Sequence, residues 1–585
     1  MEVIEKSSSS LPEDLPHPLD VFVREVAEVT AKLAGITPEQ AMELIEVPKQ
    51  ADYAVCVPKI NKFAKLKGKP NDFAAKWAQE FTPTPLLTSA TAAGPYLNFD
   101  INKAELAKVL LPSIHKLGEN WGCSNEFKGK TAVIEFSSPN IAKPFHFGHL
   151  RSTVIGNFLK NVHKAMGYNV VAINYLGDWG KQYGLLAVGF KKHGSEEKLQ
   201  ADPIMHLFDV YVAINKDAEA DPEIHNQARA YFKKMEDGDE EALSLWRKFR
   251  GLSIDEYKKR YQQLNVEFDV YSGESMFSEG MLEAVKELED KGLLTEDKGA
   301  MICDLTAYKL GKVVIKKSDG ATLYITRDIA AAIHRKKEYN FDKMVYVVAA
   351  QQNLHFQQLF KILELMDKPW ASECQHINFG MVLGMSTRKG TVRFLSDILE
   401  ESKEHMLQII QSNEEKSAEI ENLDKTAEVV GVSAIIVQDF SARRIKDYHF
   451  NLERATASEG DTGPYLQYAH ARLASVERKC AEKDGTTVNP DADLSLLTEK
   501  EAHDLILKLA RYPAAIKAAF EQTEPCTLVT YLMDLCHSIS ACHRELWIIG
   551  REKPLAEARM LLFSAARVTL ANGMRLLGLD PLERM

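Results

Sequence analysis

Residues 131–166 read TAVIEFSSPNIAKPFHFGHLRSTVIGNFLKNVHKAM, and they decide the fold. The first six residues are mostly β-branched or apolar, which predicts a buried strand. Pro139 and Pro144 then interrupt regular structure. From His149 onward, apolar residues recur at steps of three and four, which predicts an amphipathic helix. The stretch therefore predicts a strand, a loop and a helix, with His146 and His149 at the first turn of the helix.

The first turn of this helix has the properties of an anion site. Backbone N–H groups and the positive end of the helix dipole point outward there, and Gly148 has no side chain to keep a ligand away. His146 and His149 could donate hydrogen bonds to phosphoryl oxygens as charge develops in a transition state. The alternative is that two histidines three residues apart are a structural accident. Lys143 and the strand just before the loop favour the phosphate site.

A parallel sheet is the expected setting for this stretch. Residues 169–174, NVVAIN, predict a second strand after the helix. A strand, a helix and a second strand in this order form the right-handed crossover of a parallel sheet. Nucleotides bind such sheets at the carboxyl ends of the strands, where residues 137–149 lie. Residues 129–131, GKT, form no phosphate-binding P-loop, because Ser124 replaces the leading glycine and the segment precedes a strand.

The sheet domain is predicted to cover residues 126–410. Long charged helices at about 190–300 are interpreted as an insertion whose charged faces are solvated. After the insertion we expect strands to resume at 301–305, 322–326 and 344–350.

Separate units are predicted on either side of this domain. Residues 1–16 are rich in serine, proline and acids, which predicts disorder. Residues 17–125 predict a small domain of mixed helices and strands. A charged linker is expected near 412–426, and residues 427–585 predict helices only.

Composition describes an ordinary soluble protein of several domains. The 585 residues are 45% hydrophobic and 26% charged, and the net charge of −11 argues against a generally basic nucleic-acid coat. The eight cysteines are scattered without a C-x-x-C pair, which indicates a reducing compartment and no zinc site. No apolar run has membrane-spanning length, and the N-terminus lacks the features of a signal or transit peptide. A cytoplasmic location is expected.

The tetrapeptide His146-Phe147-Gly148-His149 resembles the HIGH signature of class I aminoacyl-tRNA synthetases. Residues 137–153, SSPNIAKPFHFGHLRST, resemble arginyl-tRNA synthetases in particular, and the likeness extends to residues 94–99, 461–472 and the closing LGLDPLERM. The resemblance implies a multidomain fold: a Rossmann-like α/β parallel-sheet catalytic domain with a helical insertion, an N-terminal α+β domain that contacts the tRNA elbow, and a C-terminal all-α anticodon-binding domain.

The resemblance assigns catalytic roles to three residues, His146, His149 and Lys143. It also implies an ATP site, which comprises His146, Gly148, His149, Met385, Ser386, Arg388 and Lys389. The KMSKS loop of class I synthetases is replaced by Gly384-Met385-Ser386-Thr387-Arg388, without the signature lysines. In arginyl-tRNA synthetases with this departure, the lysine before the HIGH histidines is thought to supply the lost charge. Lys143 holds that position, and Arg388 with Lys389 remains an alternative.

Two acids suit an arginine substrate. Glu135 ends the first strand and Asp328 follows the strand predicted at 322–326, so both are expected at one edge of the sheet. A guanidinium is a planar fork of N–H donors that two carboxylates accept at charge-assisted strength. Lysine or citrulline would leave a buried carboxylate unpaired. The alternative for Asp328 is an acid that caps a helix. The resemblance adds four further arginine-binding residues: Ser138, Asn140, Tyr324 and Gln352.

Aromatic residues in the outer domains are candidates for contact with tRNA. The resemblance places Tyr96 and Asn98 against a loop base, with packing of Tyr96 into its own domain as the alternative. Tyr465 and Tyr468 lie three residues apart on one predicted helical face and could stack on anticodon bases, or pack in the core. Met585 ends a C-terminus that resembles the segment reaching toward the anticodon.

The sequence therefore predicts an enzyme that activates L-arginine with ATP and transfers it to the 3′-terminal adenosine of tRNA(Arg). Mg²⁺ is expected with the ATP, with no dedicated metal site, no membrane and a monomeric chain. The alternatives are another class I synthetase, a small nucleotidyltransferase, or a synthetase paralogue that binds RNA but has lost its chemistry.

Overall fold

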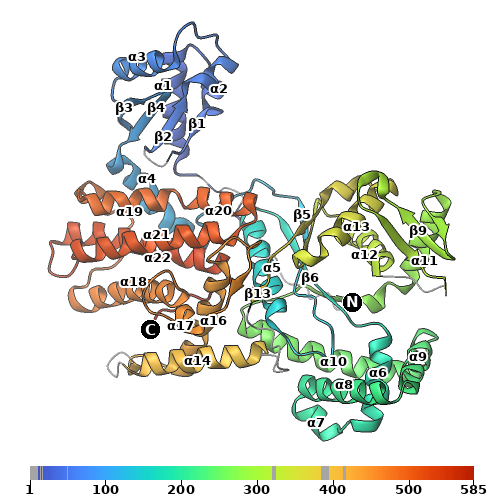
Figure 1. Ribbon diagram of the computed structural model, residues 1–585. Helices are drawn as coiled ribbons and strands as arrows, with labels where there is room; N and C mark the ends of the chain where they lie inside the picture. The colour runs from blue at the N-terminus through green and yellow to red at the C-terminus, as the bar shows by residue number, and fades with distance from the viewer. Residues whose placement is uncertain are drawn as a thin grey trace.

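Three regions make up the molecule (Figure 1). The computed structural model describes residues 11–12, 15, 17–48, 51–318, 324–383, 394–412 and 417–585. In Figure 1 the blue N-terminal domain stands on the orange and red C-terminal helices, and the sheet domain, in cyan to yellow, lies beside those helices.

The N-terminal domain is an antiparallel sheet covered by helices, in the strand order β1-β2-β4-β3. Side chains along β4 alternate between exposed and buried, as expected for a sheet with one face in the core. The predicted mixture of helices and strands is confirmed. The elements are α1 (Asp20–Ala34), α2 (Pro38–Met42), β1 (Ile45–Glu46), β2 (Tyr53–Cys56), α3 (Pro70–Glu80), β3 (Leu87–Ala93) and β4 (Tyr96–Ile101).

The sheet domain is built on five parallel strands in the order β12-β11-β5-β6-β7. Its central strand is buried along almost its whole length, which explains its continuous apolar run. The strands predicted at 131–136, 169–174 and 344–350 are confirmed to within a few residues. The strands are β5 (Thr131–Glu135), β6 (Asn169–Leu176), β7 (Val270–Gly273), β11 (Lys343–Val347) and β12 (Cys374–Ile377).

Helix α5 (Phe147–Ala165) connects β5 to β6 and lies at the centre of the molecule. It packs against β5, β6 and β11 on one side and against two C-terminal helices, α20 (Tyr512–Gln522) and α22 (Lys553–Leu576), on the other. Most of its residues are buried, so its polar residues are buried too.

The helical insertion is shorter than the predicted range of about 190–300. Its helices run from Lys181 to Gln263, and Val270–Gly273 then returns as the edge strand of the parallel sheet. The prediction is wrong there because a four-residue strand that pairs with a distant segment leaves little local periodicity. The insertion consists of α6 (Lys181–His193), α7 (Glu196–Ala201), α8 (Pro203–Ala220), α9 (Glu223–Glu236) and α10 (Glu240–Gln263).

The strand predicted at 301–305 does not join the parallel sheet. It corresponds to β9 (Ala300–Asp304), the middle of a small antiparallel sheet with β8 (Thr295–Asp297) and β10 (Lys312–Lys316). The strand predicted at 322–326 is wrong over its described part, since α12 (Tyr324–Tyr339) begins there. Tertiary packing overrides the strand propensity of its β-branched residues. Two further helices of this domain are α11 (Ser278–Asp290) and α13 (Asn353–Leu365).

The C-terminal part is helical with one exception. The two-residue strand β14 (Tyr448–His449) pairs in parallel with β13 (Val382–Leu383), where only helices are predicted. Helix α4 (Lys103–Leu117) packs on α19 (Lys500–Ala510) and α22 and so attaches the N-terminal domain. The remaining helices are α14 (Leu395–Gln411), α16 (Leu423–Phe440), α17 (Leu452–Ala455), α18 (Gly463–Asp484) and α21 (Pro525–Glu545). In the described ranges, no helix is both long and apolar enough to cross a membrane.

Candidate active site

The turn formed by residues 146–149, called the HFGH turn below, begins helix α5 and is capped by its own histidines. His146 is the N-cap residue, and its Nδ1 accepts the backbone N–H of Gly148 at 3.1 Å. Nδ1 of His149 accepts the backbone N–H of His146 at 3.3 Å. The two rings stack with their centroids 3.7 Å apart. The predicted placement of both imidazoles at the first turn is confirmed.

The protonation of these imidazoles follows from their surroundings. Burial and the charge of Lys143 lower the pKa of His146. Burial, His146 and Lys143 lower the pKa of His149 well below its usual value. Both rings are therefore neutral at pH 7, and because each Nδ1 accepts a backbone N–H, each proton resides on Nε2. The turn thus keeps two Nε2–H donors at the N-terminus of a helix, where an anion is favoured.

The loop between β5 and the HFGH turn is strained and tightly held. Ser137, Ser138 and Ala142 adopt positive φ values of 71°, 48° and 59°. Such conformations cost about 1–3 kcal/mol each for residues with side chains and concentrate at functional sites. Ser137 Oγ lies 2.8 Å from the hydroxyl of Tyr261, which also accepts a hydrogen bond from Asn174 Nδ2 at 2.9 Å.

Helix α10 of the insertion holds this loop along one face. Ser253, Tyr257 and Tyr261 are four residues apart, so they line one side of the helix. Ser253 Oγ accepts the backbone N–H of Ala142 at 3.1 Å. The Tyr257 hydroxyl lies 2.7 Å from the carbonyl oxygens of both Asn140 and Lys143. The insertion is therefore part of the site and not merely an addition to its outside.

Two of the site residues predicted in this loop, Asn140 and Lys143, are not buried. The backbone of Asn140 forms a bridge to Gly177 at the end of β6. A Cβ at Gly177 would lie 2.1 Å from Asn140 Oδ1, so a side chain at this position would displace the Asn140 amide. The ammonium group of Lys143 lies 5.5 Å from the ring centroid of Tyr211 on α8, a cation–π contact.

Glu135 has a partner within the protein. Its carboxylate forms an ion pair with Arg335 of α12, Nη1 to Oε2 2.5 Å, and both side chains are buried. Burial raises the pKa of Glu135, while Arg335 opposes that rise. The guanidinium also lies over the rings of Tyr175 and Tyr346. An internal arginine therefore already pairs with Glu135, and the binding of a substrate guanidinium by Glu135 stays a prediction.

Glu274, which sequence reasoning missed, is a second acid near Asp328, whose charge also raises the pKa of Glu135. It follows β7 in a 3₁₀ turn, η3 (Glu274–Met276), and its carboxylate meets Arg327 Nη1 at 3.0 Å. Burial raises its pKa to about 7; Arg327 lowers it, and the nearby charges of Asp328 and Asp178 raise it further. Its only sequence signal is the Gly-Glu-Ser turn after a short strand, whereas the burial that marks it comes from tertiary structure.

Asp178 binds the backbone next to Glu274, at Ser275, and so fixes the position of Glu274. Its carboxylate accepts hydrogen bonds from the backbone N–H and the hydroxyl of Ser275, both at 2.9 Å, and from Nε of Arg250 at 2.8 Å. Asp178 is fully buried at the end of β6. The carboxyl ends of β5, β6 and β7 are thereby joined by direct contacts into one edge of the sheet.

The other predicted arginine-binding residues lie around this edge. Asp328 is in the first turns of α12, and its Oδ2 is 2.6 Å from Nε2 of His355. Tyr324, at the beginning of the same helix, is 61% exposed. Gln352 is exposed in the 3₁₀ turn η5 (Ala350–Gln352) after β11, and Ser138 is half-buried in the strained loop. The predicted ATP-binding residues Met385, Ser386, Arg388 and Lys389 lie outside the described residues.

Comparison with known proteins agrees with this geometry. The model of the class I (R) tRNA synthetase catalytic domain matches residues 116–452. The arginyl-tRNA synthetase N-terminal domain matches 21–101, and the DALR anticodon-binding domain matches 466–585. The chain belongs to the arginyl-tRNA synthetase family.

Relatives of this family match the chain over nearly its full length. The "Probable arginine--tRNA ligase, cytoplasmic" of Dictyostelium discoideum is 52% identical, over 97% of this chain and 100% of that protein. The "Arginine--tRNA ligase, cytoplasmic" of Saccharomyces cerevisiae is 49% identical, over 97% and 95%. The crystal structure of the Thermus thermophilus arginyl-tRNA synthetase shares the fold at a TM-score of 0.78 and 23% identity, over 96% of this chain and 100% of that one.

In this synthetase the residues predicted to contact tRNA differ in exposure. Tyr96 is exposed and Asn98 half-buried on the same face of β4, since the buried positions of that strand alternate with them. Tyr465 on α18 is half-buried, with its hydroxyl 3.3 Å from Ser540 Oγ. Tyr468 is exposed one turn further along α18. Their contact with tRNA remains a prediction.

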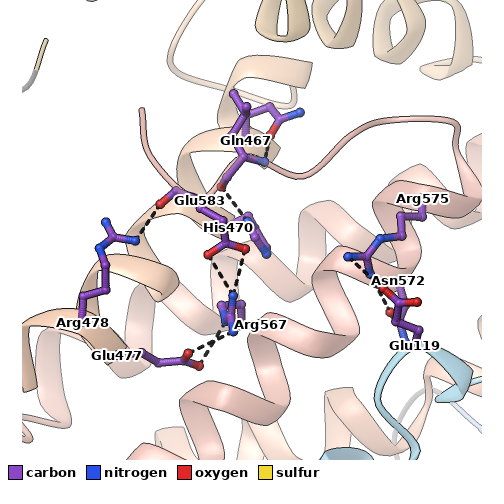
Figure 2. Close-up of polar contacts among 10 residues, drawn as sticks. Glu119, Gln467, His470, Glu477, Arg478, Arg567, Asn572, Arg575 and Glu583 are labelled. Atoms are coloured by element: carbon purple, nitrogen blue, oxygen red, sulfur yellow. Dashed lines mark hydrogen bonds and ion pairs between the residues drawn. The ribbon is translucent and has the colours of Figure 1, made fainter. Parts of the chain in front are cut away.

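The C-terminal segment of the synthetase is fixed to the helices α18 and α22 by polar contacts (Figure 2). Gln467 accepts the backbone N–H of Leu582 and donates to the carbonyl of Asp580, at 2.9 and 2.8 Å. Arg567 forms an ion pair with Glu583 at 3.0 Å. Met585 packs against the apolar cluster between α14 and α16. The segment predicted to reach the anticodon is thus held in one position on the helical domain.

Proposed function

We propose that the chain activates L-arginine with ATP at the HFGH turn and transfers the arginyl group to the 3′-terminal adenosine of tRNA(Arg). One observation supports this assignment above the others: two neutral imidazoles with Nε2–H donors begin a helix at the sheet edge that also carries the acids Glu274 and Asp328. The first feature suits a triphosphate and the second a guanidinium.

Activation needs little covalent chemistry from the protein. The carboxylate of arginine attacks the α-phosphorus of ATP in line, pyrophosphate leaves, and arginyl-adenylate remains bound. Negative charge that develops on the phosphoryl oxygens meets the Nε2–H groups of His146 and His149 and the helix N-terminus. The backbone at Gly148 admits the phosphate, and Lys143 brings positive charge to the same loop. Each hydrogen-bond donor of this kind contributes about 3–4 kcal/mol to transition-state stabilisation in well-studied enzymes.

Glu274 and Asp328 are proposed to bind the guanidinium of the substrate, in place of the pair Glu135 and Asp328. The charge of Asp328 acts on both Glu274 and Glu135. The partner of Glu274 within the protein, Arg327, is not fully buried, whereas Arg335, the partner of Glu135, is buried. Displacement of Arg327 by the substrate guanidinium would keep the charge balance of the site. Lysine would leave one carboxylate incompletely paired, which costs several orders of magnitude in discrimination.

The outer domains are proposed to hold the tRNA. Tyr96 and Asn98 present an aromatic ring and an amide on the solvent face of the N-terminal sheet, where an unpaired base could stack. Tyr465 and Tyr468 offer the same chemistry on α18, at about 1–3 kcal/mol per stacked base. Met585 ends the C-terminal segment on the same helical domain. The proposed domains are residues 17–125, which bind the tRNA elbow, 126–410, which catalyse the reaction, and 427–585, which bind the anticodon.

Three finer points accompany the proposal. Mg²⁺ is expected to enter with the triphosphate, held mainly by phosphate oxygens and water. The chain is proposed to act as a monomer in the cytoplasm. Relatives named cytoplasmic support the location, although a relative named mitochondrial, from Saccharomyces cerevisiae, is 45% identical over 98% of this chain.

The test is pyrophosphate exchange and aminoacylation with purified protein, tRNA(Arg) and each of the twenty amino acids. Only arginine should support both reactions, and His149→Ala should lower the exchange rate by about 10²- to 10³-fold. Exchange with a different amino acid, or a His149→Ala enzyme with the wild-type rate, would contradict the proposal.

A further inference from the structure

Arg151 is a buried residue of α5 for which the activation chemistry has no direct use. It follows His149 by two residues, and its side chain is 1% exposed. Its Nε lies 3.0 Å from Oδ2 of Asp439 near the end of α16, and Asp439 is 2% exposed. The ion pair joins the helix of the HFGH turn to a helix on the C-terminal side of the chain.

The guanidinium of Arg151 also binds two other segments. Nη1 donates to the carbonyl oxygen of Gly380 at 2.7 Å and to that of Lys446 at 3.1 Å. The ring centroids of Phe379 and Tyr448 lie 5.7 and 5.2 Å from its Cζ. One side chain of α5 therefore contacts segment 378–383, which follows β12, and segment 441–451, which connects α16 to α17.

These two segments are themselves locked together and to the C-terminal helices. A Cβ at Gly380 would lie 2.6 Å from Asp447 Oδ1, so segment 441–451 closes directly over that glycine. Arg444 donates through Nη1 to Asn378 Oδ1 at 3.0 Å and through Nε to the carbonyl of Thr523, between α20 and α21, at 3.1 Å. The contacts form a continuous path from the HFGH turn to the helical domain.

The Arg151–Asp439 ion pair is not expected to contribute much to the stability of the fold. Among the described residues, Asp439 Oδ1 is buried without a hydrogen-bond partner, and burial raises the pKa of Asp439. Buried ion pairs with unsatisfied atoms are often neutral or destabilising relative to apolar residues of the same volume. A charged pair at this junction therefore fits a requirement for a defined geometry better than a requirement for stability.

We propose that Arg151, held by Asp439, is a positioning residue for the activation step. It fixes the beginning of α5 against segments 378–383 and 441–451, so that the imidazoles of the HFGH turn meet the phosphate with correct geometry. A displacement of about 1 Å at such a site lowers a rate by roughly 10²-fold. The inference rests on the proposed function, because it assigns Arg151 to the same reaction.

The test compares Arg151→Lys and Asp439→Asn with wild type in pyrophosphate exchange, with rates normalised to titrated active sites. Lysine keeps the charge but lacks the fork that reaches Asp439, Gly380 and Lys446 together. Arg151→Lys should lower kcat by about 10- to 100-fold while KM for ATP and arginine changes less than about threefold. Asp439→Asn keeps an acceptor for Tyr448 and should lose less activity. If Arg151→Lys gives no soluble protein, Asp439→Asn alone tests the inference.

A double-mutant cycle separates positioning from general damage. In a His149→Asn background, Arg151→Lys should lower the residual rate by a smaller factor than it does in wild type, since one of the two imidazoles that it positions is gone. Ser402→Ala is the matched control, because it removes a buried hydrogen bond of 3.1 Å to Gly431 on α16 without touching Arg151. It should lower the melting temperature and leave kcat unchanged.

Three results would overturn the inference: wild-type kcat in both Arg151→Lys and Asp439→Asn, an equal loss of kcat in Ser402→Ala, or full additivity of Arg151→Lys with His149→Asn. If the wild-type protein showed no arginine-dependent pyrophosphate exchange, that result would contradict the proposed function instead. Failure of the inference and failure of the proposed function are therefore distinguishable.

Discussion

Arginine binding should tighten as the pH rises through about 7, because Glu274 must lose a proton before it can accept a guanidinium. Burial raises the pKa of this carboxyl to about 7. Such a group is ionised in about a tenth of the molecules at pH 6 and in about nine tenths at pH 8. The dissociation constant for arginine should therefore fall about tenfold between these values, which corresponds to about 1.4 kcal/mol.

Calorimetry on enzyme saturated with tRNA and a non-hydrolysable ATP analogue measures this change directly. In two buffers of different ionisation enthalpy, about half a proton should be released per arginine bound at pH 7. The imidazoles of His146 and His149 should contribute little, since their pKa values lie below the usual range. Asp328→Asn should move the transition to lower pH, because it removes a like charge beside Glu274.

Glu274→Gln is the decisive variant. It should bind arginine weakly and with the same affinity from pH 6 to pH 8, because the glutamine amide does not titrate. A constant affinity in the wild type, or a tenfold change that survives in Glu274→Gln, would refute the assignment of the guanidinium to Glu274.

Three other variants test separate contacts. Arg335→Met should lower the free energy of unfolding by about 3–5 kcal/mol at pH 8, and by less at pH 5, where its partner carboxylate can be protonated; denaturant titration at both pH values checks this. Gly177→Ala should raise KM for arginine at least about tenfold, because its Cβ would displace the Asn140 amide, whereas Gly251→Ala, with nothing within 4 Å, should be silent in the same assay. Gln467→Leu should raise KM for tRNA in aminoacylation several-fold and leave KM for ATP unchanged at saturating tRNA, since it frees the C-terminal segment from α18; an unchanged KM for tRNA would argue against a role for that segment.

The parts of the fold that depend on local pattern could be predicted from the sequence. The strand at 131–136 and the helix after it follow from the apolar run and its change of period, and the His146 and His149 pair is fixed by its place at that junction. The parts that could not be predicted depend on distant partners. Glu135 is paired with Arg335, 200 residues away in sequence, and no local signal announces that the acid is already occupied.

The same limit explains why Glu274 escaped notice. Its strand, β7, has four residues and exists only because it pairs with β6, some hundred residues earlier. The prediction of a strand at 322–326 is wrong for a different reason. Its β-branched residues have a strand pattern, but packing stabilises a helix from Tyr324 onward. Sequence therefore predicted the turn that begins α5 better than the strands and ion pairs that depend on distant segments.

The capping role of His146 and His149 links catalysis to acid tolerance. A ring nitrogen that accepts a backbone N–H can do so only while it carries no proton. Acidification would thus turn both Nδ1 atoms from hydrogen-bond acceptors into donors and break the hydrogen bonds at the beginning of α5. The enzyme would lose activity and this end of the helix would unwind at the same pH. A synthetase that evolved for acidic surroundings would therefore have to replace both functions of these histidines: the hydrogen bonds that cap α5 and the Nε2–H groups that bind the phosphate.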